Sequence, residues 1–319
     1  MTSATIDAST AGTWTLGDLT VNRLGFGAMR LTGSAAFNLG TPSDRAGAIA
    51  VLRLAVQLGV NHIDTAAFYF SALRSANELI NRALYPYPEG LVIVTKVGPG
   101  RDPSGTWLPW ARPDQLRGQV EENLRQLGRD HLDVVNLRVD GPGSIADHFG
   151  ALADLRAEGL IRYLGVSGVD TAQLDEAVAI APVVCVQNRW GLGVGHESDE
   201  VLRACGERGI AFVPFFAIAG DGRARGAVAR TAAASGPLAS SGSAGVAASG
   251  GDEEVAAVAA EHGATPAQVR LAWTLHQGRH VLAIPGTGNP AHVTENVAAG
   301  GLRLTGEDLG RLARVHERG

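Results

Sequence analysis

The feature that most constrains this chain is a rhythm of eight short apolar runs separated by segments with helical spacing. The runs cover residues 24–29, 61–64, 91–96, 132–137, 163–167, 183–187, 211–215 and 281–285. Near-continuous apolar runs of this length are typical of parallel strands buried on both faces. Eight of them, alternating with helices, favour an α/β fold with a closed (β/α)8 TIM barrel over an open doubly wound sheet, which usually has fewer strands.

The segments between the runs carry helix signals. Residues 46–59 place apolar side chains on one face and end at Gly59, and residues 113–128 begin with Pro113 and stop at Gly128. The same pattern predicts helices over 144–159, 171–181, 198–209, 252–263 and 265–278, with an extra surface helix over 306–319. Ahead of the first run, residues 13–21 predict a hairpin that turns at Gly-Asp.

One segment breaks the rhythm. Residues 219–251 are dominated by Gly, Ala and Ser, with almost no large apolar side chain. A linker between two domains is one interpretation. Because the helical pattern resumes directly at residue 252, we favour a long flexible loop over the mouth of the barrel. Residues 1–319 are therefore expected to form one barrel domain with long loops at the carboxyl ends of its strands.

The composition of the chain argues against several classes of binding partner. The net charge of −5 and the isoelectric point near 6.0 give no electrostatic footprint for nucleic acid or an anionic membrane. The chain has two cysteines, no apolar run long enough to span a bilayer and no signal-peptide pattern at its start, which predicts a cytoplasmic location. The histidines and cysteines show no metal-ligand spacing, so no metal is expected. We expect a small-molecule substrate and a monomer or small homo-oligomer.

Polar residues occur where the predicted strands end, which is the edge where barrel active sites form. Asp64 ends the second run, Lys96 ends the third, and Tyr69 follows Asp64 on the same loop. Taken singly, an Asp is often a helix cap, a Tyr a packed ring and a Lys a solvated charge. Together they suit acid–base chemistry. The lysine would lower the tyrosine pKa, the carboxylate would hold the lysine, and the tyrosine would donate a proton to an oxygen that gains negative charge.

These residues carry a family resemblance. HIDTAAFY, which contains Asp64 and Tyr69, resembles the Asp-Thr-Ala-x-x-Tyr motif of the aldo-keto reductases, and VTKV resembles the strand with that family's lysine. Further similar segments are RLGFGAMRL, LGVSG, GIAFVPFFAIAG and AIPGTGNPAHVTENV, so that the resemblance extends in order from about residue 13 to 317. It implies a bacterial-type reductase that uses NADPH, with NADH as an alternative.

The resemblance also assigns roles. Asp64, Tyr69 and Lys96 would be three of four catalytic residues. The cofactor would be bound by Ser167, Gln187, Phe215, Gly286, Thr287, His292 and Asn296. Ser167 and Gln187 would contact the nicotinamide amide, Phe215 would stack on its ring, and the others would line the adenosine phosphate site, where a helix amino terminus offers N–H groups. The family's usual Asn after the serine is Gly168 here, and its usual Lys and Arg are replaced by Gly286 and His292.

The largest departure from the family pattern occurs at the fourth catalytic position. Where the family carries a histidine, this chain has Arg138. Arginine remains charged and cannot act as a general acid near neutral pH. It could pair with Asp140 or Asp64 as a structural group, polarise a carbonyl, bind a substrate carboxylate, or favour reduction of an activated C=C bond. As a second cation, it would lower the Tyr69 pKa further.

The implied activity is hydride transfer from NADPH to an aldehyde or ketone carbon. The alternatives are reduction of an activated C=C or C=N bond, an NADPH-binding regulatory module with little turnover, and a barrel isomerase or aldolase that uses Lys96 differently. Trp107, Trp110 and Trp190 could line a substrate pocket or only cover the barrel.

Overall fold

The computed structural model describes residues 6–34, 39–218 and 250–318. Its centre is a parallel sheet whose neighbouring strands follow the chain order. The strands are β3 (Phe26–Gly27), β4 (His62–Asp64), β5 (Val92–Val97), β6 (Leu132–Arg138), β7 (Ile161–Ser167), β8 (Val183–Gln187) and β9 (Ala211–Phe212). They confirm seven of the eight predicted strands.

The eighth predicted strand closes the ring. Leu24 pairs with Ala283 and Phe212 pairs with Val281, both in parallel. The Ala283 amide donates to Arg23 at 2.8 Å, and the Leu282 amide donates to Phe212 at 2.9 Å. Residues 281–283 therefore lie between β9 and β3, which makes the sheet a closed (β/α)8 barrel.

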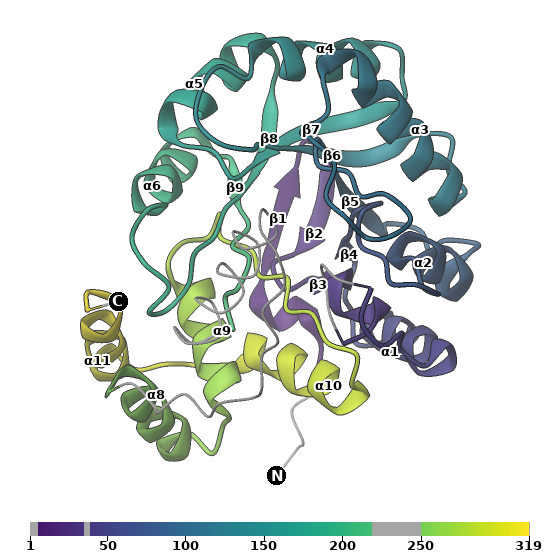
Figure 1. Cartoon of the computed structure of the whole chain (residues 1–319). Helices are drawn as coiled ribbons and strands as arrows, with labels where there is room; N and C mark the ends of the chain where they lie inside the picture. Colours follow the sequence, from purple (N-terminus) through teal and green to yellow (C-terminus); the bar gives the residue numbers. More distant parts are fainter. Residues whose placement is uncertain (1–5, 35–38, 219–249, 319) are drawn as a thin grey trace.

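Helices surround the barrel (Figure 1). Along the chain they are α1 (Arg45–Gln57), α2 (Ala76–Leu84), α3 (Leu116–Leu127), α4 (Ala146–Ala157), α5 (Thr171–Ile180), α6 (Asp199–Arg208), α8 (Gly250–Glu261), α9 (Pro266–His276), α10 (Pro290–Ala298) and α11 (Gly306–His316). Short 3-10 helices occur at η1 (Ala8–Ala11), η2 (Ala28–Thr32), η3 (Pro113–Gln115) and η5 (Ala299–Gly301). Helix α2 is not among the predicted helices. It begins after Ser75, whose hydroxyl accepts the Glu78 amide proton.

The predicted hairpin is present as β1 (Thr13–Leu16) and β2 (Leu19–Asn22). Gly17 lies in its turn with a φ of +68°, a conformation that glycine adopts without strain. Leu16 and Val21 join the hydrophobic cluster inside the barrel, together with Val92 near the amino end of β5. The hairpin thus covers the amino-terminal end of the barrel, and the opposite end is left for the site.

The strands are apolar because both of their faces are buried. All six residues of β5 are buried, and so are six of the seven in β6. One cluster fills the barrel interior, and a larger one lies between the strands and the helices. A polar residue at a strand's carboxyl end is therefore held on a rigid support.

Most of the predicted 219–251 loop lies outside the described residues, and so do both ends of the predicted 1–319 domain. The exceptions are Gly250 and Gly251, which form the first turn of α8. The loop prediction is wrong for these two residues. None of the described helices is long and apolar enough to cross a membrane.

Candidate active site

Five polar residues end neighbouring strands at one edge of the barrel. Asp64 ends β4, Arg138 ends β6, Ser167 ends β7 and Gln187 ends β8, while Lys96 is the penultimate residue of β5. Register pairs Arg138 with Ser167, and Ser167 with Gln187. Because parallel strands bring their carboxyl ends together, residues far apart in sequence meet here.

Lys96 and Asp64 form a buried ion pair. The Lys96 Nζ lies 2.6 Å from Asp64 Oδ1 and 2.8 Å from Oδ2, and it also donates to the Thr65 carbonyl at 2.9 Å. Both side chains are almost fully buried. Burial alone would lower the pKa of Lys96, but the charge of Asp64 and the neighbouring Tyr69 outweigh it and raise that pKa. The lysine is therefore a fixed cation.

Gln187 completes the surroundings of the carboxylate. Its Nε2 donates to Asp64 Oδ2 at 2.8 Å. The amide that the family resemblance assigns to the nicotinamide therefore also holds Asp64. Asp64 receives charged and neutral donors together, which fixes its orientation.

Tyr69 lies beside this pair on the loop after β4. The Lys96 Nζ is 4.9 Å from the centre of its ring, and the side chain is buried. Burial raises the pKa of Tyr69, whereas the charges of Lys96 and Arg138 lower it, and the net effect is a raised pKa. The expectation that the cations leave this pKa below its usual value is therefore wrong, because burial outweighs them. The phenol is held in its protonated form.

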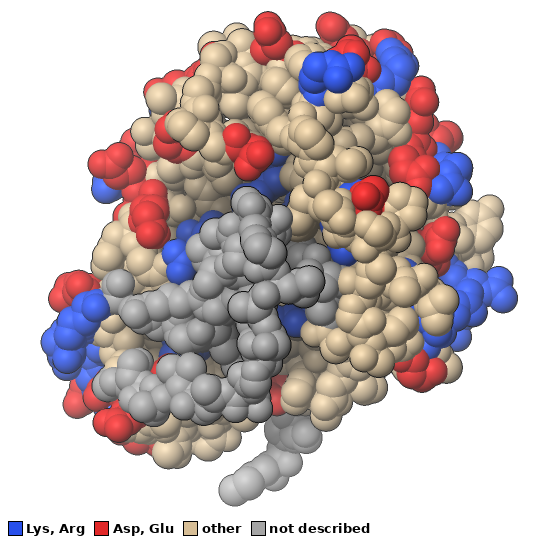
Figure 2. Space-filling view, in the orientation of Figure 1, with Lys and Arg blue, Asp and Glu red and all other residues tan. Residues whose placement is uncertain are grey.

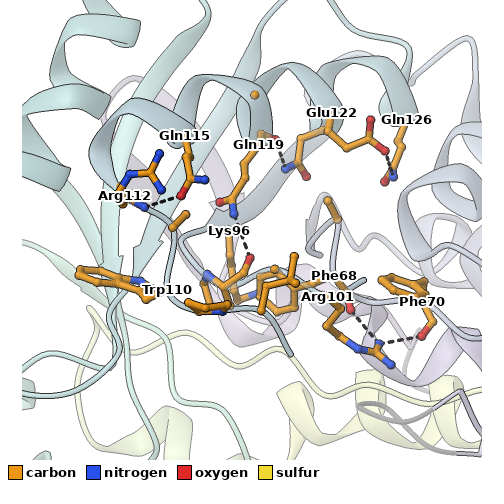
Figure 3. Close-up of a pocket in the computed structure, with 18 residues that line it drawn as sticks. Phe68, Phe70, Lys96, Arg101, Trp110, Arg112, Gln115, Gln119, Glu122 and Gln126 are labelled. Atoms are coloured by element: carbon orange, nitrogen blue, oxygen red, sulfur yellow. Dashed lines mark hydrogen bonds between the residues drawn. The ribbon is translucent and has the colours of Figure 1, made fainter. Parts of the chain in front are cut away.

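Arg101 clamps the loop that carries Tyr69. Its Nη1 donates to the carbonyl of Phe68 at 3.2 Å and to that of Phe70 at 2.9 Å, on either side of Tyr69 (Figure 3). Its guanidinium also covers the Phe70 ring at 4.3 Å, and the side chain is buried. No local pattern indicates this role, since a basic residue among glycines and prolines looks like a solvated loop residue.

Arg138 has a different environment. Its Nη1 donates to the Ser167 hydroxyl at 3.3 Å, and its guanidinium lies 5.2 Å from the centre of the Phe215 ring. Among the described residues, no carboxylate oxygen lies within 4.0 Å of a guanidinium nitrogen of Arg138, so none forms an ion pair with it. The structural alternative, in which Arg138 pairs with Asp140 or Asp64, is therefore wrong.

Gly168 makes room for Arg138. A Cβ at residue 168 would lie 2.4 Å from the Arg138 Nη1. The glycine has a φ of +72°, and the Asn188 Oδ1 accepts the amide protons of Gly168 and Val169 at 2.8 and 3.1 Å. Positions 138 and 168 are two separate departures from the family pattern in sequence, and the structure brings them into contact.

The three tryptophans divide into two groups. Trp107 and Trp110 are half-buried beside the site, and the Trp110 Nε1 donates to the Arg138 carbonyl at 2.9 Å. Trp190 is only 2% exposed and stacks on Trp273 at 5.1 Å, so it is a packed core residue.

The other residues assigned to a cofactor surround the same rim. Phe215 follows β9 and is half-buried. A Cβ at Gly286 would lie 2.5 Å from the Gly27 carbonyl oxygen, so the close approach of two backbones excludes a larger residue there. Thr287 and Asn296 are buried, and the exposed His292 lies 3.4 Å from the Thr287 hydroxyl through its Nδ1. Of these residues, Gly286, Thr287 and His292 lie at the amino terminus of α10.

A cavity of about 740 Å³ lies between α3 and the loops after β4 and β5. It is lined by Phe68, Phe70, Arg101 and Trp110 on one side and by Gln115 of η3 and Gln119, Glu122 and Gln126 of α3 on the other (Figure 3). Lys96 reaches its wall, but Tyr69, Arg138 and Phe215 do not line it. The cavity lies beside the reactive groups rather than over them.

One group of possible metal ligands occurs among the described residues, away from the rim. His196, Asp199 and His316 place their ligand atoms within 4.8 Å of one another. Asp199 already accepts from the Trp190 indole at 2.7 Å and lies 2.8 Å from the His196 Nδ1. Hydrogen bonding accounts for this carboxylate without an ion.

The comparisons with known proteins agree with one another. Pyridoxine 4-dehydrogenase of Escherichia coli is 44% identical over 310 residues, covering 95% of this chain and 97% of that protein. An uncharacterised oxidoreductase of Schizosaccharomyces pombe is 36% identical, covering 97% of this chain and 92% of that protein. The crystal structure of an aldo/keto reductase from Klebsiella pneumoniae in complex with NADP and acetate has a TM-score of 0.70 at 26% identity, covering 93% of this chain and 92% of that one. Residues 23–317 match the aldo/keto reductase family, and the chain belongs to that family.

Proposed function

We propose that this chain is an NADPH-dependent oxidoreductase that interconverts a small aldehyde and its alcohol, with Tyr69 as the proton donor in reduction. The observation that carries the proposal is the buried contact of Tyr69 with a lysine that Asp64 holds through both carboxylate oxygens. A protonated phenol beside a fixed cation can give up its proton as negative charge develops on a carbonyl oxygen.

The residues at the rim fit a dinucleotide. Gly27 and Gly286 let two backbone segments pack closely at the rim, and α10 offers an amino terminus next to Thr287. On the face shown in Figure 2, several positively charged side chains lie toward the middle, and most acidic side chains lie toward the margin. Ser167, Phe215, Thr287 and Asn296 would hold the cofactor. When bound, NADPH supplies the hydride.

The chain's own residues manage the proton. Tyr69 would donate its phenol proton to the carbonyl oxygen, while Lys96 stabilises the phenolate that remains. Solvent would return a proton to Tyr69 after the alcohol leaves. In the oxidative direction the phenolate accepts the alcohol proton, so that one set of residues serves both directions.

The substrate class follows from the relatives and from the site. The 44% identical relative is a pyridoxine 4-dehydrogenase, so we place pyridoxine and pyridoxal first among the candidates. Reduction of an activated C=C or C=N bond is the second candidate. It is favoured by the cation at Arg138, since a cation that polarises an enone oxygen makes the β-carbon a better hydride acceptor.

The test begins with cofactor binding. Titration with NADPH and NADH, followed by quenching of tryptophan fluorescence, should give saturable binding with NADPH the tighter ligand. A panel of pyridoxal, benzaldehydes, enones and imines is then assayed by NADPH absorbance. Failure to bind either dinucleotide would overturn the proposal. Binding without turnover of any substrate would favour the regulatory-module alternative.

A further inference from the structure

Arg138 is a cation whose hydrogen-bonding capacity is largely unused. A guanidinium carries five N–H donors. Among the described residues its side chain makes one long hydrogen bond, 3.3 Å to the Ser167 hydroxyl, and its carbon lies over the Phe215 ring at 5.2 Å. Neither contact supplies a negative charge.

The position of this cation is built into the local backbone. The Gly168 φ of +72° and its missing side chain open the space that the guanidinium occupies. Asn188 fixes the turn by accepting two backbone amide protons. Trp110 fixes the strand end by donating to the Arg138 carbonyl. The backbone around the guanidinium is therefore fixed by contacts with other elements of the rim.

A half-buried cation of this kind stabilises an anionic partner. Burial lowers the pKa of Arg138, and the nearby Tyr69 and Asp140 only partly oppose this effect. A ligand that brings a negative oxygen would recover the solvation that the guanidinium has lost. Planar oxyanions match the geometry of its donors.

We infer that Arg138, seated against Gly168, is a specificity-determining residue that binds an anionic oxygen of the substrate close to the reacting carbonyl. This inference rests on the proposed function and narrows its substrate class. The oxygen can belong to a carboxylate or to an ionised ring hydroxyl, and both place one negative oxygen beside the reacting group.

The turnover arm of the test compares four aldehydes. These are 2-carboxybenzaldehyde, 2-hydroxybenzaldehyde, the neutral 2-methoxybenzaldehyde and benzaldehyde itself. The wild type should prefer the carboxylate, the ionised phenol or both over the methoxy compound by roughly tenfold to a hundredfold in kcat/KM, as expected for a charge-assisted hydrogen bond. The separate ratios identify which oxygen is recognised.

Variants then assign the preference to Arg138. In Arg138→Met the preference should fall close to one. Gly168→Asn should lower it as well, because asparagine tolerates the left-handed backbone but occupies the space of the guanidinium. The double variant should be no worse than Arg138→Met alone. A ratio within one preparation does not depend on how much of that preparation is folded.

A control and a binding arm complete the design. Arg117→Met removes an exposed arginine of α3 that is paired with Glu158, and this variant should retain the wild-type ratio. Benzoate and benzamide are titrated against the NADPH-loaded protein. Benzoate should bind roughly tenfold tighter or more in the wild type, and the advantage should vanish in Arg138→Met.

The outcomes separate the two claims. If benzoate binds in an Arg138-dependent manner but no aldehyde is reduced, the proposed function fails and the anion subsite stands. If aldehydes are reduced without an anion preference, or if Arg138→Met keeps the preference, the subsite is overturned and the proposed function stands.

Discussion

Two cations at the same rim have opposite surroundings. Lys96 is buried against both oxygens of Asp64 and a backbone carbonyl, and all three of its acceptors lie within 2.9 Å. Arg138, on the neighbouring strand β6, has a hydroxyl at 3.3 Å and an aromatic face. The Lys96 charge is neutralised by the protein, whereas none of the described carboxylates neutralises that of Arg138.

The difference separates two tasks. A cation that is paired within the protein positions its neighbours and sets their protonation, which is the task of Lys96 toward Tyr69. A cation without such a partner is available to a ligand, which is the task that we assign to Arg138. A positive charge thus supports the proton donor at Lys96 and recognises a ligand at Arg138.

The largest effect is expected from the paired cation. Lys96→Met leaves the Asp64 carboxylate buried without its counter-charge. We expect a loss of about 3–5 kcal/mol in the free energy of unfolding, measured by denaturant titration, and a fall in kcat of roughly a hundredfold or more. Unchanged stability would mean that the pair contributes nothing that solvent cannot replace.

Substitution of Arg101, which binds the loop that carries Tyr69, should have the next largest effect on activity. Arg101→Lys keeps a charge but cannot bond to the Phe68 and Phe70 carbonyls in the same planar geometry. We expect kcat to fall roughly tenfold, in line with misplacement of a catalytic group, with little change in NADPH affinity. The matched control is Arg112→Lys. Arg112 is exposed, is paired with Asp114 and lies, like Arg101, in the loop after β5. An equal fall in kcat for Arg101→Lys and Arg112→Lys would show that Arg101 does not position Tyr69.

The pH dependence should follow the Tyr69 pKa, which burial raises above its usual value near 10.0. Reduction uses the protonated phenol, so its kcat/KM should be constant through neutral pH and fall only as the pH rises through this pKa. Oxidation uses the phenolate and should rise toward the same limit. Arg138→Met removes a charge that lowers the Tyr69 pKa and should move both limbs to higher pH. A reduction rate that falls near neutral pH would contradict the raised pKa.

The smallest effect is expected on stability at the unpaired cation. Arg138→Met removes no ion pair among the described residues and relieves the cost of a half-buried charge. We expect its free energy of unfolding to stay within about 1 kcal/mol of the wild type. Denaturant titration beside Lys96→Met provides the contrast. A loss as large as that of Lys96→Met would show that Arg138 is a structural cation after all.

Much of this architecture could be predicted from sequence, because a strand buried on both faces must be apolar throughout. The eight runs and the residues that follow them placed Asp64, Tyr69, Lys96 and Arg138 on one edge, and the family resemblance added their catalytic roles. Helix α2 is absent from the predictions, although Ser75 caps it, because its apolar stripe is short.

Other features could not be predicted because they depend on tertiary contacts. Nothing local indicates that Arg101 reaches the carbonyls on both sides of Tyr69, or that Gly168 and Arg138 touch. The net pKa of Tyr69 depends on the balance between burial and charge, and only the burial of the folded chain decides it. The expectation from charges alone therefore had the wrong sign.

Tyr69 is proposed to give the proton that accompanies hydride transfer. The most direct measurement is the single-turnover rate of NADPH oxidation by an aldehyde substrate, for the wild type and for Tyr69→Phe, each preloaded with NADPH. For Tyr69→Phe we expect unchanged NADPH quenching and a rate lower by roughly a hundredfold to ten-thousandfold. A Tyr69→Phe rate equal to that of the wild type would contradict it.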